Sequence, residues 1–158
     1  YMLYGNIRSE DDMRYWVKDM LDRQAKGNDL PFAVILKETG KAVGATRYME
    51  IRRKDYGLEI GGTWYGVQYQ RTFVNKETKL LLLTHAFEKL GCIRVQFKTD
   101  LRNEQSQRAL ERLGAVKEGV LRNHMLLPGG VIRHSVYYST IREEWPGVKV
   151  TIEKKLGY

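Results

Sequence analysis

The 158-residue chain lacks the features that mark several large classes of protein. No run of residues approaches the roughly eighteen apolar positions that a membrane-spanning helix needs, so we expect no association with a membrane. The chain has one cysteine, Cys92, which excludes an internal disulfide and favours the reducing cytoplasm. Cys92 could act as a nucleophile, but its position between a helix and a strand favours a small core residue.

Metal and nucleic-acid sites also lack their usual signals. None of the three histidines, His85, His124 and His134, has a second ligand at metal-binding spacing, so we expect no metal. The formal net charge is +8, but basic residues are mostly interleaved with acidic ones, and the one compact basic cluster, residues 52–54, is interpreted as a solvated loop. A nucleic-acid-binding domain is an alternative, but the sequence lacks the strand motif of interleaved aromatic and basic residues that would favour it.

Apolar periodicity predicts a single α/β (α+β) domain over residues 1–158, with a mixed, mostly antiparallel sheet. A strand, a long helix and a second strand in the middle should form a right-handed parallel unit, with antiparallel hairpins on either side and helices on both faces. The segment after Trp145 receives no assignment. The predicted helices cover residues 9–25, 76–90 and 103–113, and the predicted strands cover residues 32–36, 43–51, 58–65, 93–99, 116–121, 125–127 and 131–141.

The most informative segment runs from Leu58 to Gly91, where a polar loop at residues 68–75 joins a strand to the long helix predicted to begin near Lys76. A loop that ends at a helix N-terminus presents free backbone N–H groups where the helix dipole favours negative charge. Such a site suits a phosphate or pyrophosphate, with Arg71 and Lys76 as nearby cations. The alternative is an ordinary exposed loop before a capped helix.

Four segments together resemble the GNAT acetyltransferases, and within them the branch of the RimJ and RimL ribosomal-protein N-terminal acetyltransferases. Residues 70–75, Gln-Arg-Thr-Phe-Val-Asn, lie where this family has an Arg/Gln-x-x-Gly-x-Gly/Ala loop. Residues 103–115 resemble the branch's Asn-x-x-Ser helix and its Leu-x-x-Leu-Gly-Ala end, and residues 118–122 resemble the next strand. Residues 133–139 and 144–146 resemble the last strand and the tail.

The resemblance extends from about Pro31 to Trp145, and two departures from the family pattern affect what it implies. Phe73 and Asn75 replace the two small residues of the loop, which normally let the backbone approach a phosphate closely. The family also has a further strand and helix upstream, so we expect this chain to lack its first strand and helix.

The resemblance implies that acetyl-CoA binds as a co-substrate along the loop and the two central strands. The backbone around Trp64, Tyr65 and Val67 is the expected edge for pantetheine, although Trp64 and Tyr65 also fit a core role. Asn103 is expected to bond pantetheine while it caps a helix, and Arg108 either contacts the 3′-phosphate or is solvated. The residues expected to hold the pyrophosphate are Gln70, Arg71, Thr72, Phe73, Val74, Asn75 and Lys76.

The activity implied by the resemblance is N-acetyl transfer to a primary amine, by direct attack in a ternary complex. Ser106 matches the serine expected at the departing thiolate, and the alternative is an exposed helix serine. Glu59 is the candidate base, acting through water, and the alternative is a strand residue paired with an arginine. The acceptor is a protein N-terminal α-amino group or a small amine, and exposed edge strands would permit a homodimer. A non-catalytic acyl-CoA-binding module is the alternative function.

Overall fold

The computed structural model describes residues 7–27 and 29–158 of the chain. Within these ranges, no helix is both long and apolar enough to cross a membrane. Short helical turns at Arg53–Asp55 and Val67–Tyr69 flank β3, and a π-helical turn at His85–Lys89 extends α2. The elements in chain order are α1 (Glu10–Ala25), β1 (Leu30–Leu36), β2 (Lys41–Arg52), β3 (Gly57–Tyr65), α2 (Phe73–Thr84), β4 (Arg94–Asp100), α3 (Glu104–Leu113), β5 (Val116–Leu127), β6 (Val131–Ile141) and α4 (Trp145–Leu156).

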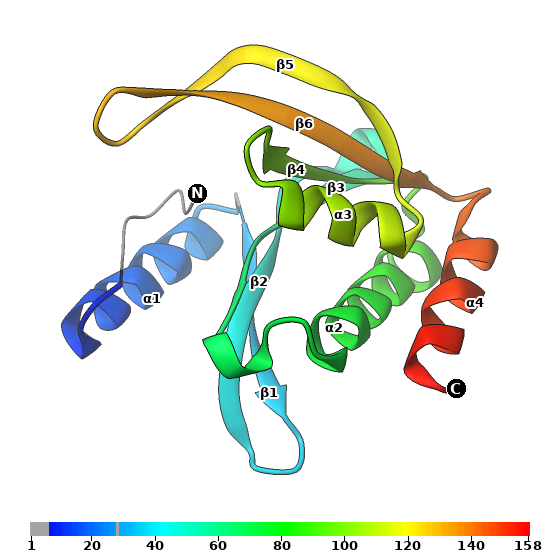
Figure 1. The fold of residues 1–158 in the computed structure, drawn as a ribbon, viewed down its shortest axis with the longest axis horizontal. Helices are drawn as coiled ribbons and strands as arrows, with labels where there is room; N and C mark the ends of the chain where they lie inside the picture. Colours follow the sequence, from blue (N-terminus) through cyan, green and yellow to red (C-terminus); the bar gives the residue numbers. More distant parts are fainter. Residues whose placement is uncertain (1–6, 28) are drawn as a thin grey trace.

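The strands of the described residues form one six-stranded sheet in the order β1-β2-β3-β4-β6-β5. The pair β3 and β4 is parallel, with α2 in the connection between them, and the other neighbouring pairs are antiparallel. A parallel pair needs a crossover of this kind, whereas the antiparallel pairs β1–β2 and β5–β6 are closed by short turns. This topology confirms the expected mixed, mostly antiparallel α/β sheet around a central parallel unit (Figure 1).

The main core lies between the sheet and the helices α2, α3 and α4, which group together on one side of it (Figure 1). Leu83 of α2, Val95 of β4 and Val136 of β6 have no exposed surface in this core. Tyr48 of β2 reaches across to α2, where its hydroxyl donates to the carbonyl of Leu82 at 2.6 Å. Burial of these apolar side chains supplies the main free energy that holds the helices against the sheet.

Helix α1 packs on the other face of the sheet, over the half formed by β1, β2 and β3. Its Met20 is buried against Arg47 of β2, and its Trp16 meets Trp64 of β3 edge to face at 5.6 Å between ring centroids. The helix begins where the sequence predicts, because the Ser9 side chain accepts from the backbone N–H of Asp12 in a capping box.

Two helix boundaries differ from the sequence prediction. Helix α2 begins at Phe73 rather than near Lys76, because Thr72 serves as its N-cap. Helix α4, which received no assignment, begins at Trp145 and has Pro146 in its first turn. Trp145 anchors this helix by stacking on Phe87 at 5.4 Å between ring centroids.

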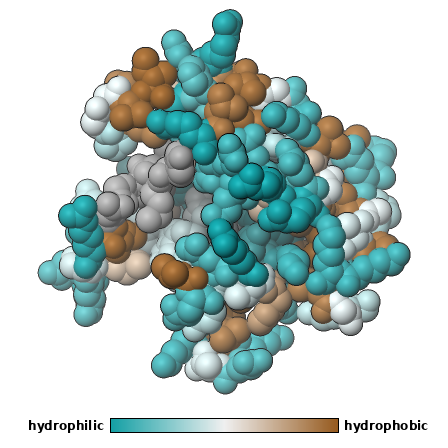
Figure 2. All heavy atoms as spheres, viewed as in Figure 1, coloured by the Kyte–Doolittle hydropathy of each residue, from teal (hydrophilic) through white to brown (hydrophobic). Residues whose placement is uncertain are grey.

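Strand β5 also differs from the prediction, which divided it into two pieces. It runs without interruption from Val116 to Leu127, but its register against β6 shifts between Leu121 and Met125. Asn123 in that interval has a positive φ of 50°, a conformation that asparagine tolerates better than most residues. Leu126 and Ile132 of the β5–β6 hairpin are exposed apolar residues. Apolar patches between polar ones are visible along the upper rim of the molecule (Figure 2).

Replacement of Leu83 by Ala should lower the free energy of unfolding by about 2–5 kcal/mol, because Leu83 is fully buried in the core and its truncation leaves a cavity. Leu81, which is 65% exposed on the same helix, provides the matched control, and Leu81→Ala should change stability by less than about 0.5 kcal/mol. Urea unfolding followed by circular dichroism measures both. Equal losses would contradict the placement of the core on this face of α2.

Candidate functional site

The two central parallel strands part soon after they begin. β3 and β4 pair at three positions only, Gly57 with Arg94, Leu58 with Val95, and Glu59 with Gln96. Beyond this point β4 stays paired with β6 as far as Asp100, while β3 stays paired with β2. Among the described residues, the side of β3 that faces β4 after Glu59 therefore has no strand partner, and the two strands splay apart.

A bulge in β3 marks the place where the strands part. The pairing of β2 with β3 shifts between Ala45 and Arg47, and Gly62 of β3 has a positive φ of 59°. A Cβ atom at Gly62 would lie 2.8 Å from the Arg47 side chain, so both the backbone conformation and the space require glycine here. The bulge bends β3 away from β4, and α2 begins beyond the end of β3.

The N-terminus of α2 is only partly capped by the protein. The Thr72 hydroxyl accepts from the N–H of Val74 at 3.3 Å and donates to the carbonyl of Tyr69 at 2.7 Å. In the part of the chain that the structure describes, the backbone N–H groups of Arg71, Thr72, Phe73 and Asn75 have no hydrogen-bond acceptor. These donors are available to an external anion, and the positive end of the helix dipole favours one.

The charges near this helix end differ from those of the other capped helices. The first turn of α1 contains three acidic residues and that of α3 contains Glu104, whereas the first turn of α2 has no acidic residue. Arg71, immediately before the cap, is exposed and has a positive φ of 62°, which costs an arginine about 1 kcal/mol. The positive end of the α2 dipole therefore has no acidic side chain in its first turn to neutralise it, unlike the positive ends of α1 and α3.

The structure brings several predicted loop residues together with the end of β3. The Tyr65 hydroxyl donates to Asn75 Oδ1 at 3.2 Å, and burial raises the pKa of Tyr65 to about 12. The Gln70 side chain donates to the carbonyl of Tyr65 at 3.3 Å, and its backbone N–H donates to the carbonyl of Val67 at 3.2 Å. The carbonyls of Tyr65 and Val67 therefore already have protein partners. Phe73 is half-exposed and Val74 is buried.

Two predicted binding residues point elsewhere. Lys76 Nζ donates to the carbonyl of Lys155 in α4 at 3.3 Å, so its ammonium is directed away from the cap of α2. Arg108 is exposed and forms an ion pair with Glu104 at 2.9 Å, which agrees with the alternative interpretation of a solvated helix residue. Trp64 packs against Trp16, and its indole N–H is buried without a partner among the described residues.

The residues predicted on α3 lie at the start of that helix, just after the end of β4. The Asn103 side chain accepts from the backbone N–H of Ser106 at 3.1 Å and is the N-cap of α3. Ser106 is half-buried, and within the described ranges its hydroxyl has no hydrogen-bond partner. A hydroxyl in this state is free to donate to another group.

Glu59, the predicted base, occupies the last position at which β3 pairs with β4. Its side chain is 2% exposed, and its Oε2 atom accepts from Gln96 Nε2 at 3.0 Å and lies 3.5 Å from Lys98 Nζ. Gln96 also contacts Arg52, at 3.4 Å. The alternative of a paired strand residue is therefore partly correct, although the cation is a lysine and not an arginine.

The sequence interpretation missed Lys79, which lies on the buried face of α2 and is 6% exposed. Its Nζ donates to Thr63 Oγ1 at 2.9 Å and lies 5.7 Å from the centre of the Phe97 ring. Thr63 and Phe97 belong to β3 and β4 beyond the point where these strands part. Burial lowers the pKa of Lys79 to about 7. The helical spacing of Lys79 with the buried Leu82, Leu83 and Ala86 could have revealed this position.

No group of three or more His, Cys, Asp or Glu side chains in residues 7–27 and 29–158 is arranged to hold a metal ion. Cys92 is buried, as expected for a core residue, and burial raises its pKa. An open hollow lies at the irregular part of β5 and is lined by residues 120–124 and His134.

The candidate site at the parting of β3 and β4 consists of backbone donors, hydroxyls, a buried amine and one carboxylate.

Comparison with known proteins gives consistent results. A family model described as an acetyltransferase (GNAT) domain matches residues 1–116. An uncharacterised N-acetyltransferase, p20, from Bacillus licheniformis is 28% identical over 153 residues, which cover 91% of this chain and 82% of p20. A crystal structure from T. thermophilus, assigned as an acetyltransferase, is 42% identical with a TM-score of 0.85 and covers 94% of this chain and 76% of its own.

A third similar protein has been solved with a coenzyme. It is RimJ from Mycobacterium smegmatis in complex with CoA-disulfide, which has a TM-score of 0.77 and covers 93% of this chain and 69% of its own. At 19% identity this similarity shows a shared fold alone. The fold implied by the sequence resemblance is thus matched in three dimensions.

The buried amine of Lys79 predicts a specific pH dependence of stability. Its pKa is about 7 in the folded protein and near 10.5 in the unfolded chain, so the unfolded chain binds more protons between these values. The free energy of unfolding should therefore rise with pH between 7 and 9, by about 1 kcal/mol per pH unit from this group. Below pH 7 both states are protonated and the contribution is constant.

Lys79→Met should remove this rise and stabilise the protein at pH 7, since it replaces a buried amine with an apolar side chain of similar length. Lys89→Met is the matched control, because Lys89 is exposed on the same helical segment. Denaturant unfolding at pH 7, 8 and 9 measures both, in a range below the onset of tyrosine ionisation in the unfolded chain. Parallel pH profiles for wild type and Lys79→Met would show that the amine keeps its ordinary proton affinity.

Proposed function

The chain belongs to the GNAT acetyltransferase family, and from this premise we propose that it transfers an acetyl group from acetyl-CoA to a primary amine by direct attack in a ternary complex. The family supports acetyl transfer in general. The single observation that carries the finer proposal is the uncompensated N-terminus of α2 beside the parting of β3 and β4. Free N–H groups at Arg71, Thr72, Phe73 and Asn75 suit a pyrophosphate.

The unpaired edge of β3 suits pantetheine, which carries amide groups that can pair with strand backbone. Because the carbonyls of Tyr65 and Val67 already accept from Gln70, pairing would use the remaining backbone groups around Trp64 and Tyr65 or require the Gln70 side chain to move. Asn103, at the facing end of β4, is half-buried and keeps its amide nitrogen available while its oxygen caps α3. These positions would place the thioester between β3 and α3.

In the proposed reaction the amine nitrogen attacks the thioester carbonyl, a C–N bond forms and the C–S bond breaks. Ser106 donates a hydrogen bond to the departing thiolate, and the sulfur then takes its proton from solvent, since the free thiol has a pKa of roughly 8.5. Glu59 receives the proton of the amine through water, since its carboxylate is almost fully buried. Backbone N–H groups of the β3 bulge are the candidates to stabilise the oxyanion.

The acceptor in this proposal is a protein N-terminal α-amino group or a small amine. Cytoplasmic localisation, a single domain and a homodimer stay predictions. Acetyl-CoA binding without turnover of any amine would favour the alternative of a non-catalytic acyl-CoA-binding module. A coenzyme A release assay with a panel of amines and N-terminal peptides therefore tests the proposed activity.

Arg71→Glu should weaken acetyl-CoA binding at least tenfold, because it places a carboxylate beside the proposed pyrophosphate site. Arg71→Gly should have a smaller effect, since glycine accepts the positive φ at this position and leaves the N–H donors in place. Calorimetric titration measures both dissociation constants. Lys89→Glu makes the same change of charge at an exposed, distant site and should leave the constant unchanged. Wild-type affinity in Arg71→Glu would place the phosphates elsewhere.

Ser106→Ala should lower kcat by about tenfold to a hundredfold with little change in acetyl-CoA affinity, because the hydroxyl acts on the leaving group and not on the bound ground state. Gln105→Ala, at the neighbouring exposed position of α3, is the control and should leave kcat unaltered. Steady-state kinetics and calorimetry separate the two quantities. Full activity in Ser106→Ala would remove this serine from the mechanism.

A further inference from the structure

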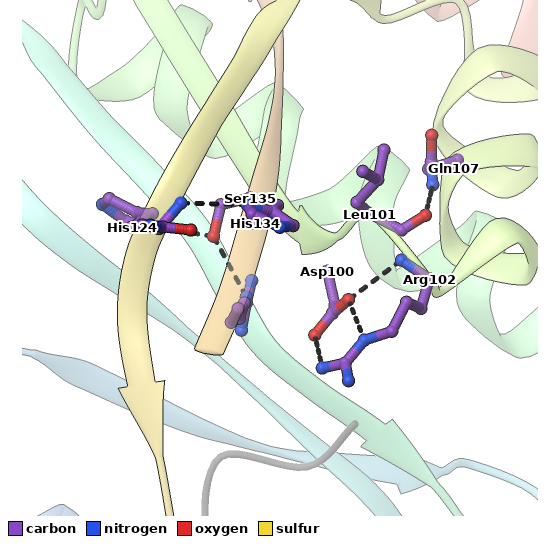
Figure 3. Close-up of polar contacts among 9 residues, drawn as sticks. Asp100, Leu101, Arg102, Gln107, His124, His134 and Ser135 are labelled. Carbon is purple, nitrogen blue, oxygen red and sulfur yellow. Dashed lines mark hydrogen bonds and ion pairs between the residues drawn. The ribbon is translucent and has the colours of Figure 1, made fainter. Parts of the chain in front are cut away.

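A polar cluster lies on the face of β4 and β6 that is turned away from the core. Side chains alternate along these strands, so Phe97 and Val136 enter the core while Lys98, Arg133 and Ser135 share the opposite face. Figure 3 shows members of this cluster and their polar contacts at the end of β4, on β5 and on β6. The proposed mechanism uses only Glu59, at the β3 side of this face.

The carboxylates of the cluster already have cationic partners. Asp100 is bonded by Arg102 through two nitrogens, at 2.7 and 2.9 Å (Figure 3). Glu59 lies 3.5 Å from Lys98 Nζ. Arg133 is 4% exposed, and among the described residues no carboxylate lies within ion-pair distance of its guanidinium. Of Lys98, Arg102 and Arg133, it is Arg133 whose charged group has no carboxylate within ion-pair distance among the described residues.

Arg133 is connected to an open surface by a short chain of hydrogen bonds. Its Nε donates to Ser135 Oγ at 3.0 Å, and Ser135 Oγ lies 2.9 Å from His124 Nδ1. His124 lines the open hollow at the irregular part of β5. Burial, Lys98 and Arg133 all lower the pKa of His124, which favours the neutral form of this histidine. His124 is therefore the residue that links the hydrogen-bonded cluster to this hollow.

The burial of Arg133 has an energetic consequence. Burial lowers its pKa, although Asp100 and Glu59 act in the opposite direction, yet a guanidinium does not release its proton in a protein. The free protein therefore carries a desolvated cation without a bonded counter-ion, which is unfavourable. An anion delivered by a ligand would remove this cost and could bond the two terminal nitrogens together.

We propose that Arg133 binds a carboxylate carried by the acceptor, so that the acceptors are amino acids or peptides with an acidic residue next to the N-terminal amine. This inference rests on the proposed function. Glu59 lies where β3 and β4 part, and Lys98 lies on the same face of the sheet, further along β4 toward Arg133. An amine placed near Glu59 can therefore direct its carboxylate along β4 toward Arg133. The common chemistry is a primary amine with a carboxylate a few bonds away.

Two matched pairs of acceptors test this inference and distinguish its two sources of carboxylate. Glycine and glycinamide differ in the α-carboxylate, while Ser-Asp-amide and Ser-Asn-amide differ in a side-chain carboxylate. The preference of the enzyme in each pair is the kcat/KM of the acidic member divided by that of its neutral partner. In one or both pairs, this preference should be at least tenfold larger in wild type than in Arg133→Gln, mainly through KM. Comparison of the ratio between wild type and variant cancels the intrinsic reactivity of each amine.

Control variants, unfolding measurements and binding titrations distinguish loss of the carboxylate site from misfolding and from loss of catalysis. Arg133→Lys should retain part of the preference, Arg112→Gln on α3 should retain all of it, and denaturant unfolding should confirm that each variant is folded. Titration of the same acceptors into the protein with CoA measures binding without turnover. A preference that is absent in wild type or intact in Arg133→Gln would overturn the inference while the acetyltransferase proposal stands. Arg133-dependent binding of an acidic acceptor with no turnover of any amine would support the carboxylate site and refute the proposed function.

Discussion

The limited parallel pairing of β3 and β4 is the constraint on which the rest of the site depends. Three residue pairs hold the strands together at Gly57–Glu59, and the bulge at Gly62 then turns β3 toward the start of α2. If β3 and β4 stayed paired along their length, the backbone N–H and C=O groups on their facing edges would be hydrogen-bonded to each other and could not bind a ligand. Because they part, one edge of β3 has no strand partner among the described residues, and the chain continues into α2 from one of the separated strands and into α3 from the other.

The two faces of the sheet at this region differ in chemistry. On the core side, the N–H groups at the cap of α2 and the hydroxyl of Ser106 are donors without protein acceptors in the described chain. On the other side, Glu59, Lys98 and Arg133 form a buried polar cluster with one cation in excess. A donor-rich side suits a phosphate-bearing carrier, and a side with a carboxylate and an unneutralised guanidinium suits an amine that bears an acid. Acetyl-CoA and the amine acceptor would therefore approach the parting of β3 and β4 from opposite faces of the sheet.

Much of the fold was predictable from the sequence, because local signals agree with the final structure. Ser9 caps α1, Gly91 and Gly114 have the positive φ expected at helix ends, and the strand–helix–strand order required one parallel pair. The beginning of α2 was misplaced because Thr72 supplies a cap that the polar composition of residues 68–75 concealed. Helix α4 was missed because its stability comes from contacts distant in sequence, such as Trp145 with Glu88 and Phe87.

The site was less accessible to sequence reasoning than the fold. The position of the loop before α2 followed from the motif, but the direction of Lys76 toward α4 and the ion pair of Arg108 depend on the tertiary structure. Lys79 lies outside every motif, and Arg133 lies in a segment that resembles the family's last strand but received no role from it. Their properties arise from burial without a carboxylate partner among the described residues, which only the packing of β3, β4, α2 and β6 reveals.

The most direct measurement is a titration of the ¹⁵N-labelled protein with acetyl-CoA, followed by backbone amide spectra. We expect saturable shifts that are largest at the amides of residues 71–75, because these N–H groups would gain acceptors on binding. Shifts confined to other parts of the chain, or no shifts at millimolar acetyl-CoA, would contradict the assignment of the α2 N-terminus as the diphosphate site.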